Sequence, residues 1–442
     1  MLHRRTVLGS LALPLVAGVA GVHARLAARQ QWGGDLNELA GRAGEPEALA
    51  GDEDFWVPVQ RAFTQDRSVI NLNNGGVSPS PWPVQEAQRR HLERANTMPP
   101  PVVLWREQEP AREPVRARLA RAWGVDAEEI AITRNASESL QICQFGLNLT
   151  KGDEVLTTTQ DYPRMLNTFR QRERREGIVL REVPLPVPCE DDAAVVRLFE
   201  QAITPRTRMI LMSHVVFLTG QILPVRAVVQ MARKHNGGIP VVVDGAHALA
   251  HLDFKISDLE CDYYGASLHK WLFAPHGTGL LYVRRDKIKA LWPLMASAQE
   301  NENDIRKFEE IGTHPVAATL AIADALTFHE AIGGARKEAR LRFLRDRWAK
   351  RLLAHPSGRV RLHTSLKPAF SCGLATVQIE GLESAPLSDW LWAKRGILTT
   401  PIKRDEFAGI RVTASVYTTL DEIDRFCEAV EWAMEHGLPA KV

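Results

Sequence analysis

Residues 241–271 read VVVDGAHALAHLDFKISDLECDYYGASLHKW, and this stretch decides the fold. Its first three residues form an apolar run typical of a strand that is buried on both faces. The run ends in Asp244, and Lys270 follows a second apolar, strand-like segment. Because carboxylates at the carboxyl ends of parallel strands face the crevice where open α/β sheets bind ligands, Asp244 is a candidate site residue.

The segments around this stretch alternate between helix-like and strand-like patterns. Strands are expected over 129–133, 153–158, 208–215 and 239–244, with helices between them, for example over 117–123 and 136–147. Near-continuous apolar strands at this spacing indicate an α/β fold, with a mainly parallel sheet covered by helices on both faces. The basic helix expected over 334–353 is interpreted as an ordinary solvated charge run.

Composition excludes some classes of function. The chain has 442 residues, which is enough for two domains, and its net charge is +2, with 55 basic against 53 acidic side chains. A nucleic-acid binder would carry a larger basic surplus, so no nucleic-acid partner is expected. The five cysteines are scattered without a CxxC pair, which favours buried thiols over disulfides or a zinc site.

The first residues, MLHRRTVLGSLALPLVAGVAGVHA, combine a basic head, an apolar stretch and a small-residue ending. This is the anatomy of an export signal, and the adjacent arginines 4 and 5 resemble a twin-arginine signal. That route carries folded proteins, which suits a protein that acquires a cofactor in the cytoplasm. We therefore expect export by the twin-arginine (Tat) machinery to the periplasm. An uncleaved membrane anchor is the alternative.

Asp244 and Lys270 together predict a cofactor. A carboxylate can keep a ring nitrogen protonated through a charge-assisted hydrogen bond, although Asp244 alone would fit an ordinary helix N-cap. Lys270 is followed by Trp271, Leu272 and Phe273, and such apolar surroundings lower the pKa of an amine. A neutral lysine forms a Schiff base with a carbonyl. An acid for a pyridine nitrogen and a Schiff-base lysine are what pyridoxal 5'-phosphate requires.

A cradle for the phosphate is predicted in TRNASESL, which lies between an expected strand and an expected helix. There Asn135, Ala136 and Ser137 place the first free amides of a helix, and these amides and the helix dipole attract an anion.

The order of eight motifs carries a resemblance to a known family. NLNNGGVSPSP, ITRNASESL, DYP, SHVVFLTGQILPV, VVDGAHA, SLHKW, IGTHP and IRVTASVYTT run from about residue 71 to 419. The chain resembles the class V aminotransferase family of pyridoxal phosphate enzymes, within it the isopenicillin N epimerase-like branch. Its signal resembles those of the periplasmic siderophore-tailoring members.

The resemblance implies fold type I of the pyridoxal phosphate enzymes, the aspartate aminotransferase-like fold, in a homodimer. It implies a large cofactor-binding domain and a smaller α+β domain. The expected organisation is a twin-arginine-type signal peptide over 1–24, a loose leader or linker over 25–51, the N-terminal part of the small domain over 52–90, the large domain over 91–315 and the C-terminal small domain over 316–442.

Roles for individual residues also follow from the resemblance. Lys270 would carry the cofactor and move the substrate's alpha proton. The remaining cofactor contacts would be Asp244 on the pyridine nitrogen, His247 near the ring hydroxyl, Tyr162 stacked on the ring, and Asn135, Ala136, Ser137, Ser267 and His269 at the phosphate, with Thr313 reaching it from the neighbouring subunit. Arg411 would clamp the substrate carboxylate, and Asn73 and Asn74 would line the entrance.

Two departures from the family pattern stand out. Relatives carry an asparagine near the cofactor where this chain has Val216 and Phe217, which leaves more of the contact to His247. Desulfurases of the family need a mobile cysteine shortly before the carboxylate-binding arginine. The stretch GILTTPIKRDEFAGIR contains none, and Cys372 lies well upstream, so desulfurase activity is not expected.

The implied activity is aminotransferase-type chemistry on the alpha-amino group of an amino acid or a peptide-linked amino acid, in natural-product or siderophore maturation. The same cofactor also serves epimerisation and elimination, so an epimerase or lyase stays open. Two distant alternatives are a metal-dependent hydrolase, with ligands drawn from Asp244, His247, His251 and His269, and a protein that binds the cofactor without catalysis.

Overall fold

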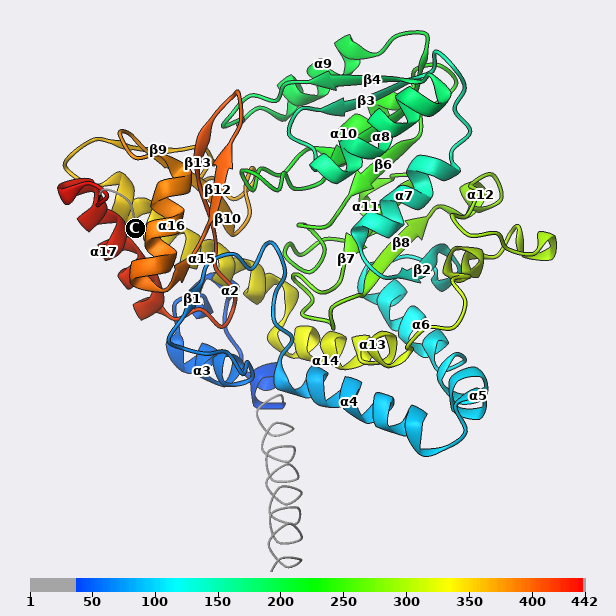
Figure 1. The fold of residues 1–442 in the computed structure, drawn as a ribbon, viewed down its shortest axis with the longest axis horizontal. Coiled ribbons are helices and arrows are strands. Elements are labelled where there is room, and N and C mark those ends of the chain that lie inside the picture. Colours follow the sequence, from blue (N-terminus) through cyan, green and yellow to red (C-terminus); the bar gives the residue numbers. More distant parts are fainter. Residues whose placement is uncertain (1–36, 440–442) are drawn as a thin grey trace, which may run out of the picture.

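The computed structural model describes residues 37–439 and has a large and a small lobe (Figure 1). A seven-stranded sheet organises the large lobe and a four-stranded sheet the small one. The predicted signal peptide and residues 25–36 of the predicted leader lie outside the described residues. Among the helices of the described part, none has the length and apolar character needed to span a bilayer.

The large sheet confirms the predicted α/β fold class. Its strands follow the order β2–β8–β7–β6–β5–β3–β4, and every neighbouring pair is parallel except those that involve β8. The carboxyl ends of β2, β3, β5, β6 and β7 therefore share one edge. The bounds are β2 (Ile130–Thr133), β3 (Glu154–Thr158), β4 (Val179–Val183), β5 (Thr207–Ser213), β6 (Val241–Asp244), β7 (Tyr263–Ser267) and β8 (Gly279–Val283).

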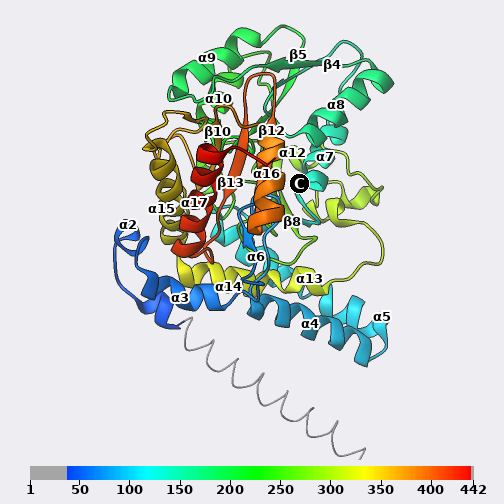
Figure 2. The ribbon, with the colours of Figure 1, turned by 60° about the vertical axis from the view of Figure 1, so that its left-hand side comes forward.

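Helices cover both faces of this sheet because its strands are apolar on both sides. One core joins the sheet to α7 (Ala136–Gly146) and α8 (Pro163–Glu176). The other core joins it to α6 (Arg112–Ala122), α9 (Asp192–Ala202), α10 (Val225–Ala232) and α11 (Ile256–Leu259). Figure 2 shows the large sheet between these helices. The large lobe also contains two short helices, α5 (Pro100–Val102) and α12 (Arg285–Ile288).

The small lobe packs helices against an antiparallel sheet of order β12–β13–β10–β9. A short strand from the N-terminal part, β1 (Ile70–Asn71), pairs with β11 (Ile397–Leu398). The other bounds are β9 (Val360–Leu362), β10 (Leu374–Ile379), β12 (Thr400–Lys403), β13 (Ala408–Thr413), α15 (Gly334–Leu353), α16 (Ser384–Arg395) and α17 (Leu420–His436).

The last part of the predicted leader, residues 37–51, has structure of its own. Residues 37–51 contain helical turns, including α2 (Pro46–Leu49), and Leu39 and Leu49 are buried. The Leu49 carbonyl accepts a hydrogen bond from the indole of Trp56 on α3 (Glu53–Arg61), at 2.8 Å. This part of the chain is packed into the fold.

The packing of α13 (Ala317–Leu320) and α14 (Ile322–Ile332) does not follow the domain boundary predicted near residue 316. The two helices bury Ile322 and Leu326 in a core of the large lobe, beside α4 (Trp82–Thr97). The C-terminal part of the small lobe's core begins on α15, at Leu344, and Ile70 and Leu72 join this core from the N-terminal part.

The basic helix α15 is not simply solvated, contrary to the sequence interpretation. Lys337, Arg340 and Arg345 are each 0% exposed. All three donate to backbone carbonyls of other segments, at Trp271, Ala50 and Cys372 respectively. Helical charge runs are usually exposed, so the sequence pattern could not reveal that other segments cover this face.

Candidate active site

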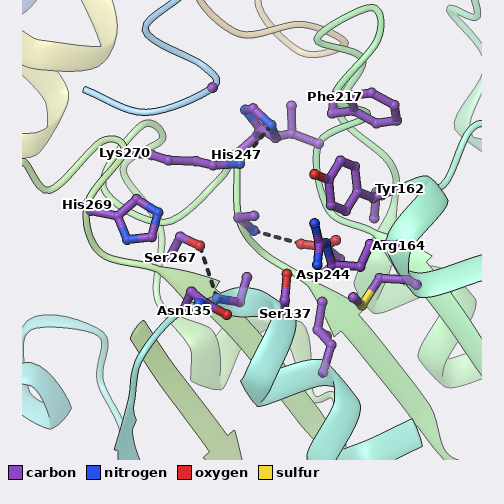
Figure 3. A pocket seen from close by; sticks show the side chains of 17 residues that line it. Asn135, Ser137, Tyr162, Arg164, Phe217, Asp244, His247, Ser267, His269 and Lys270 are labelled. Atoms are coloured by element: carbon purple, nitrogen blue, oxygen red, sulfur yellow. Dashed lines mark hydrogen bonds between the residues drawn. The ribbon is translucent and has the colours of Figure 1, made fainter. Parts of the chain in front are cut away.

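A cavity of about 340 Å³ lies at the carboxyl edge of the large sheet (Figure 3). The strand ends contribute Ser213 from β5, Asp244 from β6 and Ser267 from β7. The cavity brings together nine residues of the predicted site: Asn135, Ala136, Ser137, Tyr162, Asp244, His247, Ser267, His269 and Lys270.

The N-terminus of α7 forms one end of the cavity. Asn135 caps the helix, its side chain accepting from the Glu138 amide at 2.9 Å. The Ala136 amide donates to the Ser267 hydroxyl at 3.0 Å, which ties the helix start to β7. The first amides of a helix have no acceptor within the helix, so this end of the cavity suits an anion.

Asp244 is nearly fully buried, and one of its oxygens accepts from the Ala246 amide at 3.0 Å. Burial raises the pKa of its carboxyl to about 6, although the Ala246 amide and Lys270 oppose the rise. A buried carboxylate with a free oxygen is suited to hold a proton on a ligand nitrogen.

Lys270 lies in the turn after β7, with its Nζ 3.2 Å from His247 Nε2. Burial lowers the pKa of the amine to about 8; Asp244 opposes this shift and Arg411 adds to it. Burial also lowers the pKa of His247 well below its usual value, so near pH 8 the imidazole is neutral and about half of the lysine amine is neutral. A neutral lysine amine is a nucleophile and a proton acceptor.

His247 Nδ1 is buried and has no hydrogen-bond partner among the residues that the structure describes. Buried polar atoms of this kind normally have a partner, so the cavity wall offers an unused polar group to a ligand. His269 lines the cavity too, and its Nδ1 donates to the Thr278 carbonyl at 3.1 Å.

Arg411 on β13 brings a buried cation toward the cavity from the small lobe. Its guanidinium donates to the Phe217 carbonyl at 3.0 Å and to the Asn73 side-chain oxygen at 2.8 Å. Within residues 37–439 its Nε has no acceptor and no carboxylate is paired with it. Burial lowers its pKa to about 10, which still leaves it charged at neutral pH.

Tyr162, Phe217 and Arg164 lie on one side of the cavity (Figure 3), and Tyr162 and Arg164 are exposed, so this side is the mouth of the cavity. Tyr162 meets Phe217 edge to face, with 5.3 Å between ring centroids. Arg164, at the start of α8, also lines the cavity. The β12–β13 hairpin reaches the same region: Arg404 lies 5.9 Å from the centre of the Phe217 ring, and Glu406 accepts from the Thr159 hydroxyl at 2.6 Å.

Four predicted residues are not part of this lining: Asn73, Asn74, Thr313 and Arg411. Asn74 is fully buried, donates to the Asn71 and Thr413 carbonyls and does not line the cavity of its own chain. Asn73 holds Arg411 in place, and Gly76 is the residue of this segment that reaches the cavity. Thr313 is exposed and does not line the cavity of its own chain.

Asp161 is a site residue that sequence reasoning missed. One of its oxygens accepts from the Ser213 amide and hydroxyl, and the other from Thr157 and from the Thr158 amide and hydroxyl. These bonds join the ends of β3 and β5 directly before Tyr162. Asp161 could have been found from the sequence, because it is the first residue of the DYP motif. Arg164 was also missed, because nothing in its local sequence marks it.

The alternative chemistries find little support in this geometry. Among the described residues, no group of three or more His, Cys, Asp and Glu side chains could hold a metal ion. The β12–β13 hairpin contains no cysteine, and Cys372 is fully buried.

Comparisons with known proteins match nearly the whole described chain. The sequence model described as Aminotransferase class-V matches residues 70–426. The chain is 32% identical over 401 residues to isopenicillin N epimerase from Streptomyces clavuligerus, covering 85% of this chain and 98% of the relative. The corresponding enzyme from Amycolatopsis lactamdurans is 31% identical over 398 residues, with the same coverage.

Among solved structures, a C-DES mutant with glycine covalently linked to the PLP cofactor has the same fold. Its TM-score is 0.73 at 24% identity, covering 83% of this chain and 99% of that one.

Proposed function

This chain belongs to the aminotransferase class-V family of pyridoxal 5'-phosphate-dependent enzymes, and we propose that it acts on the alpha-amino group of an amino acid or of a peptide-linked amino acid. Transamination is the proposed outcome. Epimerisation is the second candidate, and the 32% identity to an isopenicillin N epimerase favours it.

The observation that carries this proposal is the unpaired charge of Arg411. A buried cation without a carboxylate is unfavourable unless a ligand supplies the missing anion. A guanidinium suits a carboxylate because it can donate two parallel hydrogen bonds. Arg411 lowers the pKa of Lys270, so the anion that it binds would lie near that amine. A carboxylate beside an amine-reactive lysine is what an amino-acid substrate requires.

The residues of the cavity fit the cofactor. The start of α7, with Ser267 and His269, would hold the phosphate, and the buried carboxylate of Asp244 would hold the ring nitrogen. The unpartnered Nδ1 of His247 offers a polar contact to the ring substituents. Tyr162 and Phe217 close the side of the cavity with aromatic rings.

When bound, the cofactor supplies an electron-withdrawing ring that acidifies the proton on the substrate's alpha carbon. Lys270 would accept that proton, since its amine is neutral above about pH 8. Arg411 would orient the alpha carbon through the carboxylate. The position to which the proton is returned distinguishes transamination from epimerisation, and loss of a side-chain group would make the enzyme a lyase.

The mouth of the cavity supports a substrate with a glutamate-like side chain. Arg164 and Arg404 bring two guanidinium groups to the mouth, where the nearby carboxylate of Glu406 accepts from the Thr159 hydroxyl, and Asp244 is the one carboxylate in the described lining of the cavity. Both cations can donate to a side-chain carboxylate or amide oxygen. A peptide-linked glutamate would need to be joined through its side chain, because the alpha amine must be free to react.

A homodimer is part of the proposal. Thr313 is exposed in the single chain, and a second copy would bring it to the phosphate end of the neighbouring site. Large apolar side chains are exposed at Trp105, Trp292 and Met295, which a partner could cover.

We further propose that the enzyme is exported by the Tat machinery and works in the periplasm, in the maturation of an exported peptide natural product such as a siderophore. The adjacent arginines 4 and 5 and the apolar stretch after them support this. Replacing both arginines by lysine should retain the protein in the cytoplasmic fraction. Equal amounts of wild type and variant in the periplasmic fraction would contradict the proposal.

The test of the activity is proton exchange at the alpha carbon, which every proposed outcome shares. The cofactor-loaded enzyme in D₂O should exchange the alpha proton of glutamate, read by NMR, and Lys270→Ala should abolish the exchange. Formation of a keto acid would then identify transamination, and formation of the opposite enantiomer would identify epimerisation. Absence of exchange with acidic and neutral amino acids alike, and with side-chain-linked glutamyl peptides, would contradict the proposal.

A further inference from the structure

Lys337 on α15 is a fully buried lysine that meets the segment carrying Lys270. Its Nζ donates to the Trp271 carbonyl, one residue after Lys270. The same Nζ lies 4.0 Å from the centre of the Phe273 ring. Lys337 therefore contacts two of the three residues that follow Lys270.

The turn around Lys270 needs such support because its backbone is strained. Phe273 has a φ of 61°, in the left-handed region that is unfavourable for a bulky residue. Within the turn, the Ala274 amide donates to the Leu268 carbonyl at 3.1 Å. From outside the turn, Lys337 donates to the Trp271 carbonyl.

The burial of Lys337 is unfavourable by itself. Over residues 37–439 it has no carboxylate partner, and burial lowers the pKa of its amine well below the ordinary value. An apolar side chain of similar length would fill the space without the cost of desolvating an amine. What the amine provides at this position is its hydrogen bond to the catalytic turn.

We propose that Lys337 is a positioning residue for Lys270, which it acts on through the backbone of the Trp271–Phe273 turn. This inference rests on the role of Lys270 in the proposed function. Burial and Arg411 lower the Lys270 pKa and Asp244 raises it, and Lys337 is not among these causes. Its effect is therefore carried by the hydrogen-bond donor and not by charge, and it links α15 to the catalytic residue.

A matched pair of variants distinguishes the effect of the Lys337 hydrogen-bond donor from the effect of its charge. Lys337→Gln keeps an N–H donor and removes the charge, whereas Lys337→Met removes both at a similar size. Lys350→Met is the control, since Lys350 lies on the same helix, is largely exposed and pairs with Asp346. Circular dichroism and molecular mass establish that each variant is folded.

Two readouts report on Lys270. In the cofactor-free protein, competitive labelling with acetic anhydride, read by mass spectrometry, gives the pH midpoint of the Lys270 amine. In the loaded protein, borohydride fixes cofactor to Lys270, and the labelled peptide is counted. We expect Lys337→Met to raise the midpoint by about half a pH unit or more, because a loosened turn admits water to the amine. We also expect it to lower the fixed cofactor about threefold, with Lys337→Gln and the control close to wild type.

Equal behaviour of the Met and Gln variants would overturn the inference, as would a Met variant that loses stability while the Lys270 midpoint stays unchanged. If Lys337→Met does not fold, the Gln variant decides: an unchanged midpoint supports the donor role, and a shift of half a unit overturns it. If wild-type protein fixes no cofactor at Lys270, the proposed function fails, and the labelling midpoints still decide the role of Lys337.

Discussion

Asp244 lies at the end of β6, where its carboxyl has a pKa of about 6, above the value of about 4 in an unfolded chain. The folded protein therefore binds more protons than the unfolded chain between about pH 4 and 6. Its stability falls as the pH rises through that window, and the charged carboxylate remains unfavourable above it. The buried Asp244 carboxylate therefore favours ligand binding but lowers the stability of the cofactor-free protein.

Asp244→Asn should separate these two effects. At pH 7.5 the variant should raise the free energy of unfolding of the cofactor-free protein by about 1–3 kcal/mol, because no buried charge remains. It should also weaken cofactor binding at least tenfold, since the amide cannot hold a proton on the ring nitrogen with the same strength. Urea unfolding and cofactor titration measure the two quantities, with exposed Asp405→Asn as the control. A variant less stable than wild type would contradict this account.

Arg411 should govern recognition of the substrate's alpha carboxylate. Wild-type enzyme should bind glutamate far more tightly than the amine that lacks the alpha carboxylate, and Arg411→Met should remove most of that preference, about 10- to 100-fold. Calorimetric titration of the cofactor-loaded enzyme measures both ligands. Arg404→Met, at the mouth, should keep the preference for the alpha carboxylate. A preference that survives in Arg411→Met would exclude Arg411 as its source.

The start of α7 depends on close packing against β8. A Cβ at Gly279 would lie 2.6 Å from the backbone of Asn135, the cap of α7. Gly279→Ala should therefore displace the helix start and weaken binding of inorganic phosphate and of cofactor at least tenfold. Titration of the folded variant checks this. Gly41→Ala, where a Cβ meets nothing within 4 Å, is the control and should bind both as wild type does. Unchanged phosphate binding in Gly279→Ala would contradict a role for this end of the cavity.

At the level of helices and strands, much of the site could be predicted from the sequence. The strand ending at Asp244, the strand-like segment before Lys270 and the helix over 136–147 follow from local sequence patterns, so the sheet edge and its polar residues could be derived. The burial of Lys337 and the burial of Asn74 could not. Both depend on contacts between segments far apart in the chain, at Trp271 and Thr413, which no local pattern encodes.

The two lobes meet at the cavity, and both contribute residues to the site. Arg411 comes from the small lobe, while Lys270 and Asp244 come from the large one, and Asn73 of the N-terminal part holds the guanidinium. The family resemblance implied this convergence, whereas residue patterns alone did not. The domain boundary was harder to predict because α14 packs with the large lobe, although it directly precedes the first helix of the small one.

The exposed apolar side chains of the large lobe predict a dimer in solution. Trp292→Glu should halve the molecular mass measured by light scattering and weaken cofactor binding, because a charge at a covered apolar face opposes association. Trp392→Glu is the matched control, since Trp392 is comparably exposed on α16 of the small lobe. A wild-type protein that is monomeric at micromolar concentration would contradict the prediction.

The most direct test of the central claim is the visible spectrum of the purified protein before and after borohydride, with mass spectrometry of the reduced chain. The account predicts a yellow protein that borohydride bleaches, with the cofactor fixed on Lys270 and no fixation in Lys270→Ala. A protein that stays colourless when pyridoxal 5'-phosphate is added, or one in which the cofactor is fixed elsewhere, would contradict it.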